Sequence, residues 1–138
     1  MLYDTSGKPC YGDMIIAKLI KLLERHKFCF KRNDETNNKV SRVFHRQTTS
    51  KNPGVDAYVE QTSQTKNNRT TEIITITFRK AKKYVGCVII KVSYSDVGFL
   101  SAKSVIDDRT SVSILETIFS KTRGTLLGTG YFGNNDIY

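Results

Sequence analysis

Apolar residues recur at helical spacing near the start of the chain, in GDMIIAKLIKLLERHKF (residues 12–28). Charged side chains occupy the positions between them, so the segment has one apolar and one charged side. This period of about 3.6 residues predicts an amphipathic helix, and Asp13 is expected to cap its N-terminus. The apolar side consists of Ile15, Ile16, Leu19, Ile20, Leu22 and Leu23.

Later segments alternate between apolar and polar residues, which is the pattern of β-strands with one buried face. FCFKR (28–32) and KVSRVFHRQ (39–47) predict a first hairpin. TTEIITITFR (70–79) and YVGCVIIKVSY (84–94) predict a second hairpin. GFLSAKSVID (98–107) is a candidate fifth strand.

A second helix is predicted from SILETIFSK (113–121), in which apolar residues again follow helical spacing. Ser113 lies three residues before Glu116, which is the spacing of a capping box. Gly124 is expected to end this helix, because glycine readily adopts the backbone conformation that follows a helix C-terminus.

Two segments lack such periodicity. Residues 48–70 are polar and predict a long loop in which only AYVEQ (57–61) is typical of a strand. Residues 125–138 are rich in glycine and predict a flexible tail. We therefore expect a single α+β domain over residues 1–124, followed by this tail.

The predicted order of elements is helix, two strands, long loop, two strands, a candidate fifth strand and helix. Short hairpin connections favour an antiparallel sheet, and two amphipathic helices cover only one of its faces. The fold class predicted is therefore α+β, a two-layer sandwich of four to five antiparallel strands with the N-terminal and C-terminal helices on one face. The other face is open to solvent or to a partner.

Positive charge is concentrated in two parts of this 138-residue chain, whose formal net charge is +9. Residues 18–46 hold nine basic and three acidic residues, and residues 73–95 hold five basic residues and no acidic residue. Solubility alone does not require charge to be gathered in this way. The distribution favours an anionic partner.

The stretch GTGYFG (128–133) has the spacing Gly-x-Gly-x-x-Gly, which cradles the pyrophosphate of a dinucleotide when it lies between a strand and a helix. Here only five residues, NNDIY, follow Gly133, which is too few for the helix that would hold the pyrophosphate, and no strand with a parallel partner is predicted before the glycines. We therefore expect no nucleotide site at these glycines.

The sequence contains no recognisable metal or catalytic motif. Paired Cys-x-x-Cys knuckles, the specific signal of zinc, are absent. No nucleophile elbow accompanies the cysteines and histidines, and Asp56 and Glu60 lack the context of a nuclease site. We expect a non-enzymatic protein without metal or cofactor. The residues considered as ligands or nucleophiles are Cys10, His26, Cys29, His45 and Cys87.

The predicted location is cytoplasmic, in a reducing compartment. The N-terminal segment carries Asp4 and lacks the basic start and compact apolar run of a secretion signal. No transmembrane segment is expected, because no apolar run approaches about 18 residues. The three cysteines show no paired spacing and are expected to be free thiols.

These observations predict a domain that binds a polyanion, namely RNA or DNA, through basic side chains with neighbouring aromatic rings. The alternatives are a protein-interaction or assembly module, including a homo-oligomer, that uses the open sheet face and the aromatic tail, and a binder of acidic membrane surfaces. The residues predicted to contact the polyanion are Lys31, Arg32, Arg42, Arg46, Arg79, Lys80, Lys82, Lys83, Tyr84 and Lys91.

The order of a helix, antiparallel strands and a final helix resembles the kinase-associated C-terminal domains, which bind acidic lipids. FSKTRGTLLG (119–128) resembles a turn of a small-subunit ribosomal protein. Both resemblances cover scattered positions only, so neither assigns a family.

Overall fold

The computed structural model describes residues 11–36, 39–47 and 54–138. In this part of the chain, the strands form a six-stranded antiparallel sheet in which each strand pairs with the next along the sequence. The α+β class and the antiparallel sheet are confirmed, but the sheet has more strands than the four to five predicted. In chain order the elements are α1 (Tyr11–Arg25), β1 (Cys29–Thr36), β2 (Lys39–Arg46), β3 (Val55–Lys66), β4 (Arg69–Lys80), β5 (Lys83–Ser95), β6 (Gly98–Asp108) and α2 (Ser113–Gly128).

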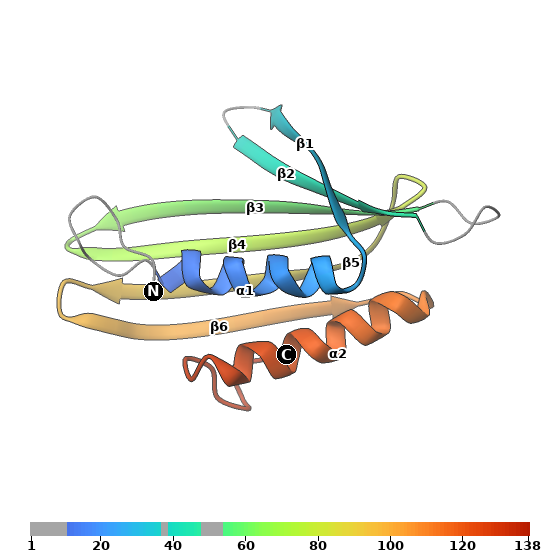
Figure 1. Cartoon of the computed structure of the whole chain (residues 1–138). Helices are drawn as coiled ribbons and strands as arrows, with labels where there is room; N and C mark the ends of the chain where they lie inside the picture. The colour runs from blue at the N-terminus through green and yellow to red at the C-terminus, as the bar shows by residue number, and fades with distance from the viewer. Residues whose placement is uncertain (1–10, 37–38, 48–53) are drawn as a thin grey trace.

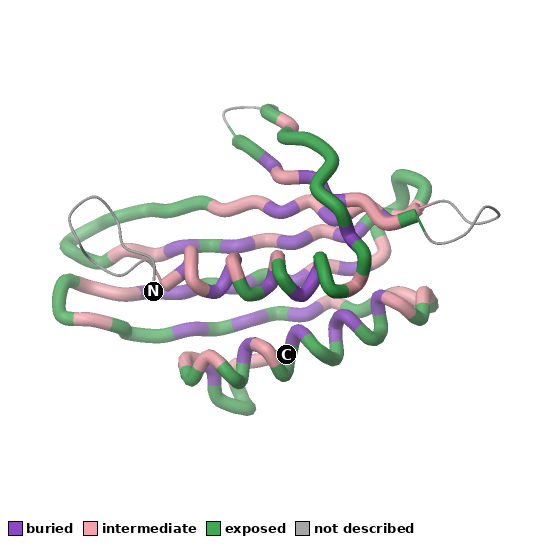
Figure 2. The backbone as a smooth tube through the Cα atoms, in the orientation of Figure 1, coloured by how far each residue is buried: buried purple, intermediate pink, exposed green. Residues whose placement is uncertain are grey.

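The two helices lie side by side on one face of the sheet (Figure 1). The first, α1, packs over β4 and β5, and α2 packs beside β6. Figure 2 shows buried residues recurring along both helices and along the strands that they cover. The β1–β2 hairpin twists away from this layer and extends beyond α1.

Three phenylalanine rings join the two layers at one end of the core. The Phe28 and Phe78 ring centroids are 6.1 Å apart, and those of Phe78 and Phe119 are 5.4 Å apart, both pairs in edge-to-face contact. All three side chains are buried. Because they come from the segment that follows α1, from β4 and from α2, their contacts fix both helices against the sheet.

The long loop predicted for residues 48–70 is wrong over most of its length. Residues 55–66 form β3, which pairs with β4 along its whole length. The connection between them is only Asn67 and Asn68, both with positive φ (53° and 62°), a conformation that asparagine tolerates well in hairpin turns. The remaining residues of the predicted loop, 48–53, lie outside the described residues.

The predicted helix boundaries also need correction. Asp13 lies within the first turn of α1 rather than at its cap, and its carboxylate accepts a hydrogen bond from the Gln61 side chain (2.6 Å). The N-cap of α2 is Val112, without a side-chain cap, so the capping box predicted at Ser113 does not form. The helix continues through Gly124 to Gly128, because Leu126 on the next turn is fully buried.

Residues 129–138, predicted to be flexible, pack against the domain in the structure. Phe132 is buried in the core, and the Tyr131 ring stacks on Phe99 with centroids 5.0 Å apart. Near its end the segment runs beside β6, where Ser104 donates its backbone N–H to Asp136 (2.8 Å) and accepts one from Tyr138 (3.2 Å). This segment therefore covers the outer edge of β6.

A buried carboxyl group holds the start of α1 against the sheet. Glu72, on β4, is only 5% exposed and accepts the backbone N–H of Gly12 (2.8 Å). Burial raises the pKa of Glu72 above its ordinary value, an effect that Asp13 adds to and that hydrogen bonds from Gly12, Gln61 and Tyr94 oppose. A carbon side chain at residue 12 would overlap this carboxyl group.

We expect Glu72→Gln to flatten the pH dependence of stability. A carboxyl group whose pKa is raised on folding stabilises the fold most below its unfolded-state pKa, and this contribution is lost as the pH rises through the folded-state pKa. The loss is about 1.4 kcal/mol for each tenfold difference in acidity between the folded and unfolded states. The amide cannot ionise, so the free energy of unfolding of the variant should fall less than that of the wild type between about pH 4 and pH 8. Urea unfolding at several pH values measures this difference.

Glu72→Ala is the control for the hydrogen bond. It leaves the Gly12 N–H without its acceptor and, compared with Glu72→Gln, should lower the free energy of unfolding by about 1–3 kcal/mol at every pH, because neither variant ionises at residue 72. If Glu72→Gln instead keeps the pH profile of the wild type, the pKa of Glu72 is not raised in the folded protein.

Candidate functional site

The face of the sheet opposite the helices carries four cationic side chains near one end. Lys91 on β5 and Lys103 on β6 are exposed and stand directly opposite each other in the strand register. Lys66 and Arg69 are also exposed, at the two ends of the turn that joins β3 and β4. Residues directly opposite each other on neighbouring strands project from the same face of the sheet, and so does every second residue along one strand. By this rule all four cationic side chains lie on the open face.

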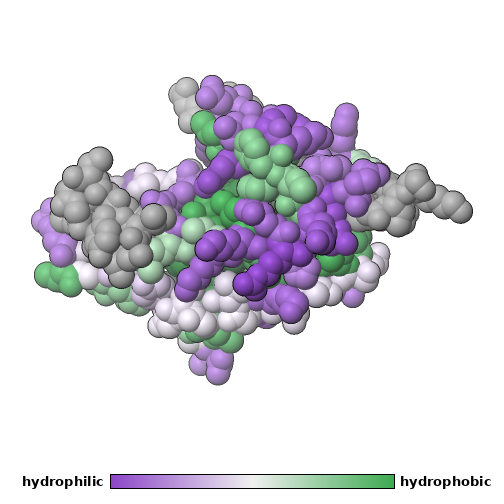
Figure 3. Space-filling view, in the orientation of Figure 1, coloured by the Kyte–Doolittle hydropathy of each residue, from purple (hydrophilic) through white to green (hydrophobic). Residues whose placement is uncertain are grey.

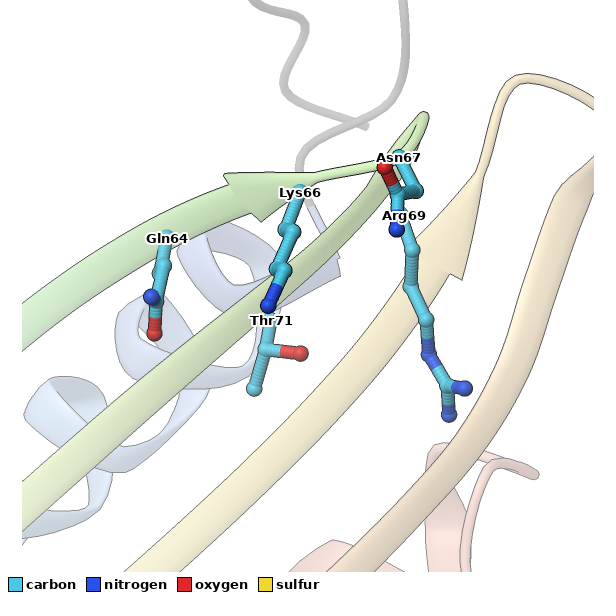
Figure 4. Close-up of a pocket in the computed structure, with 5 residues that line it drawn as sticks. All are labelled: Gln64, Lys66, Asn67, Arg69 and Thr71. Atoms are coloured by element: carbon cyan, nitrogen blue, oxygen red, sulfur yellow. The ribbon is translucent and has the colours of Figure 1, made fainter.

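These cations line two neighbouring hollows, which share Arg69 and Thr71 and together are called the basic groove here. Their volumes are about 440 Å³ and 400 Å³. Figure 4 shows the Arg69 side chain extending from β4 over β5, while Lys66 points toward Thr71. The groove is lined by Gln64, Lys66, Asn67, Arg69, Thr71, Lys91, Ser93, Ser101 and Lys103.

The charge of the basic groove is not balanced by its own lining. The described residues that line it include no aspartate or glutamate. Like charges directly opposite on neighbouring strands destabilise a sheet, so Lys91 and Lys103 repel each other unless an anion lies between them. Hydroxyl groups also reach the groove, among them Thr71 and Ser93, whose side-chain oxygens are 3.2 Å apart. Lysine, arginine and hydroxyl groups are the usual ligands of phosphate oxygens.

Apolar side chains are exposed beside the groove. Ile73, Ile89 and Val105 are 38%, 38% and 46% exposed. They occupy neighbouring positions on β4, β5 and β6, because Ile73 is opposite Lys91, and Ile89 is opposite Val105. The open face thus places an aliphatic surface next to a row of cations.

The lysines predicted at the β4–β5 turn lie at the other end of the sheet. Lys80, Lys82 and Lys83 surround this turn, and β4 separates it from Arg69 by 12 residues of strand, which span about 36 Å at the usual rise of a strand. Ala81 and Lys82 have positive φ (51° and 66°), an unfavourable conformation for residues with a side chain. The structure therefore does not bring these lysines together with the basic groove.

Other predicted residues on the open face already have partners. The Arg32 guanidinium pairs with Asp34 (2.7 Å), and this hydrogen bond raises the pKa of Arg32. Arg79 lies over the Tyr58 ring, 6.0 Å from its centroid. Their cationic groups are partly engaged within the protein.

The predicted stacking residue Tyr84 is also engaged. Its hydroxyl donates to the Asp107 carboxylate (2.6 Å), and the pKa of this hydroxyl is raised by burial first and by that hydrogen bond second. Asp107 in turn accepts from Arg109 (2.9 Å). The side chain remains 41% exposed, but it is held against β6.

Three predicted basic residues do not face the groove. Arg42 lies on the helix side of the sheet, beside Asp13 and Glu24 of α1. Arg46 donates to the carbonyl oxygen of His26 (2.7 Å) and so holds the end of α1. Lys31 occupies a bulge in β1. Of the ten predicted residues, Lys91 alone lines the basic groove.

The strand register places His45 opposite Cys29 on one side and opposite Asp56 on the other. These are the residue types of a nucleophilic triad, so we compared their contacts. The His45 Nδ1 atom is 2.5 Å from the Asp56 carboxylate, but its Nε2 atom is 3.2 Å from Gln47 Oε1. The Cys29 thiol contacts the Lys27 carbonyl oxygen instead (3.9 Å). No group of three or more histidine, cysteine or acidic side chains in the described ranges is arranged to hold a metal ion.

Lys66, Arg69 and Lys103 were not among the residues predicted from the sequence to contact the polyanion. Lys66 and Arg69 lie in the stretch predicted to be a loop, and Lys103 is separated from Lys91 by the β5–β6 connection. The available signal was the alternation in AKSV, which places Lys103 on the solvent side of its strand. Their convergence depends on the register of three hairpins, which the sequence pattern does not specify.

In comparisons with known proteins, no family model, curated protein or solved structure matches this chain. Within the described residues, neither helix has the length and apolar character needed to cross a lipid bilayer.

Proposed function

We propose that this protein binds single-stranded nucleic acid, RNA or DNA, across the open face of its sheet. The observation that supports this most directly is the basic groove, in which Lys91 and Lys103 face each other beside Arg69 without an acidic residue among the described lining residues. A phosphate between the two lysines relieves their repulsion. The adjacent hydroxyl groups supply further hydrogen bonds to phosphate oxygens.

A single strand fits this surface better than a duplex. Its bases are free to lie on the apolar side chains Ile73, Ile89 and Val105 while its phosphates follow the cations. Among the described residues, the open face offers few aromatic rings for stacking, and the predicted one, Tyr84, is hydrogen-bonded to Asp107. Affinity should therefore come mainly from phosphate contacts, depend steeply on salt and vary little with base sequence.

The test compares two triple variants with the same loss of charge. The groove variant R69A/K91A/K103A removes three proposed phosphate contacts, so the slope of log affinity against log salt should fall by about 2–3 units, at roughly 0.7–0.9 per contact. The turn variant K80A/K82A/K83A removes the same charge at the other end of the sheet and should lower the slope by less than about one unit. Fluorescence anisotropy with labelled single-stranded and duplex oligonucleotides at several salt concentrations measures both.

Each result has a distinct meaning. A larger effect of the turn variant moves the site to the β4–β5 turn, as the run of basic residues in the sequence predicts. No binding of either oligonucleotide by the wild type near about 50 mM salt, where phosphate contacts are strong, overturns the proposal and favours the protein-interaction alternative.

A further inference from the structure

The two outer strands of the sheet differ in how they are covered. Residues 136–138 run along the outer edge of β6 and form backbone hydrogen bonds with it. At the opposite edge, β1 pairs with β2 on one side, and no described residue pairs with its other side. The backbone groups of such an edge are a template for a further strand.

In the sequence of β1, CFKRNDET, the basic residues lie before Asn33 and the acidic residues after it. Lys31 and Arg32 precede Asn33, and Asp34 and Glu35 follow it. Arg32 and Asp34 project from the same face of the strand and form an ion pair, with side chains 42% and 36% exposed. Edge strands are commonly protected from pairing by their charged side chains, but here the two halves of the strand carry opposite charge.

We propose that β1 pairs with β1 of a second copy of this chain, antiparallel and about a two-fold axis at Asn33. In this arrangement Arg32 faces Asp34 of the second copy, and Lys31, at the bulge where the regular register of β1 ends, lies near Glu35 of the second copy. Each pair occurs twice because the interface is isologous. Exposed ion pairs contribute little to stability, so exchanging the Arg32–Asp34 pair within one chain for the same pair between chains has a small cost.

Charge selects this register over its neighbours. A two-fold axis at Arg32 places two guanidinium groups opposite each other, and an axis at Asp34 does the same with two carboxylates. Parallel pairing in register also brings like charges together. Because like charges directly opposite are destabilising, only the axis at Asn33 pairs every charge with its opposite.

The surroundings of β1 are consistent with a partner at this edge. Phe30 and Val40, on the helix side of the β1–β2 hairpin, are 57% and 52% exposed. Seen from that side, hydrophobic side chains gather between α1 and the hairpin, with hydrophilic side chains beside them (Figure 3). The dimer also joins the sheets so that both open faces, and hence both basic grooves, point the same way.

Sedimentation velocity and equilibrium runs of the wild type, from about 1 µM to about 1 mM, test for the dimer directly. Dimers held by a small interface are expected to have dissociation constants in this range. We expect a reversible monomer–dimer equilibrium that weakens as salt is added. A wild type that stays monomeric over the whole range overturns the proposal.

Two charge-swapped variants test whether the dimer forms through β1. In K31E/R32E the charged side chains of β1 are all acidic, and in D34K/E35K they are all basic, so each variant should repel its own kind and dimerise at least about tenfold more weakly than the wild type. An equimolar mixture of the two should recover the dimer as a heterodimer, since every pair is again opposite in charge. A homodimer of wild-type strength in either variant, or no recovery on mixing, contradicts pairing through β1.

Circular dichroism and thermal melts show whether each variant is folded. If a double variant does not fold, the single variants R32E and D34K provide the same test, because each changes one exposed side chain. In their mixture, the carboxylate introduced by R32E in one chain faces the ammonium group introduced by D34K in the other. The native Arg32–Asp34 pair remains on the second side of the two-fold axis.

Discussion

Deleting residues 129–138 should lower the melting temperature by well over 10 °C or prevent folding. This segment places Phe132 in the core and packs Tyr131 against Tyr11 and Phe99. It also covers the edge of β6, where Ile106 donates its backbone N–H to Tyr138 (3.1 Å). Phe132→Ala alone should cost about 3–5 kcal/mol, which corresponds to a drop of roughly 10–20 °C for a domain of this size.

Asn135→Ala is the matched control, because Asn135 lies in the same segment but is exposed. Its melting temperature should stay within about 2 °C of the wild type, as for most surface substitutions. Differential scanning calorimetry compares the three variants with the wild type. If the truncated protein has the same melting temperature as the wild type, the segment adds nothing to stability. The flexible tail predicted from the glycines of this segment would then be confirmed.

The sequence predicted those elements whose periodicity is strong. The alternation of Ile74, Ile76 and Phe78 marks β4, and the helical spacing around Leu19 marks α1, because burial of one side dictates an apolar side chain at each turn or every second residue. The antiparallel sheet followed from short connections between such strands. These features depend on local sequence alone.

The strand β3 was missed because half of it has no buried side. In its first half every second residue is buried in the core, but from Thr62 onward every residue is exposed. The stretch QTSQTK therefore has no alternation of apolar and polar residues that would predict a strand. This half is held by backbone pairing with β4. Its place in the sheet is therefore a consequence of the partner strand.

The basic groove was missed for a related reason. Arg69, Lys91 and Lys103 come from different strands, and a shift of one residue in either hairpin would turn one of them to the helix side. Sequence composition predicted that positive charge matters, but the gathering of charge along the chain pointed to the β4–β5 turn. The strand register brings a different set of basic residues together in space.

Gly86→Ala should be among the most damaging small substitutions in the protein. A Cβ at this position would lie 2.7 Å from the backbone oxygen of Asp107 and 2.7 Å from the Phe119 ring. The first atom belongs to the paired strand β6, and the second to a fully buried ring, so neither moves without disturbing the core. Overpacking of this kind costs about 1–3 kcal/mol, and Gly86→Val should cost more.

Gly124→Ala is the control of opposite sign. Gly124 lies inside α2, is exposed, and has nothing within 4 Å of an added Cβ. Alanine there should stabilise the protein by about 0.5–1 kcal/mol, because it restricts the unfolded chain and favours the helix. Urea unfolding of both variants, with Gly86→Ala also combined with Phe119→Leu, separates the causes. The smaller leucine should recover part of the loss if contact with the Phe119 ring causes it, and equal stability of Gly86→Ala and wild type would show that the sheet yields at this position.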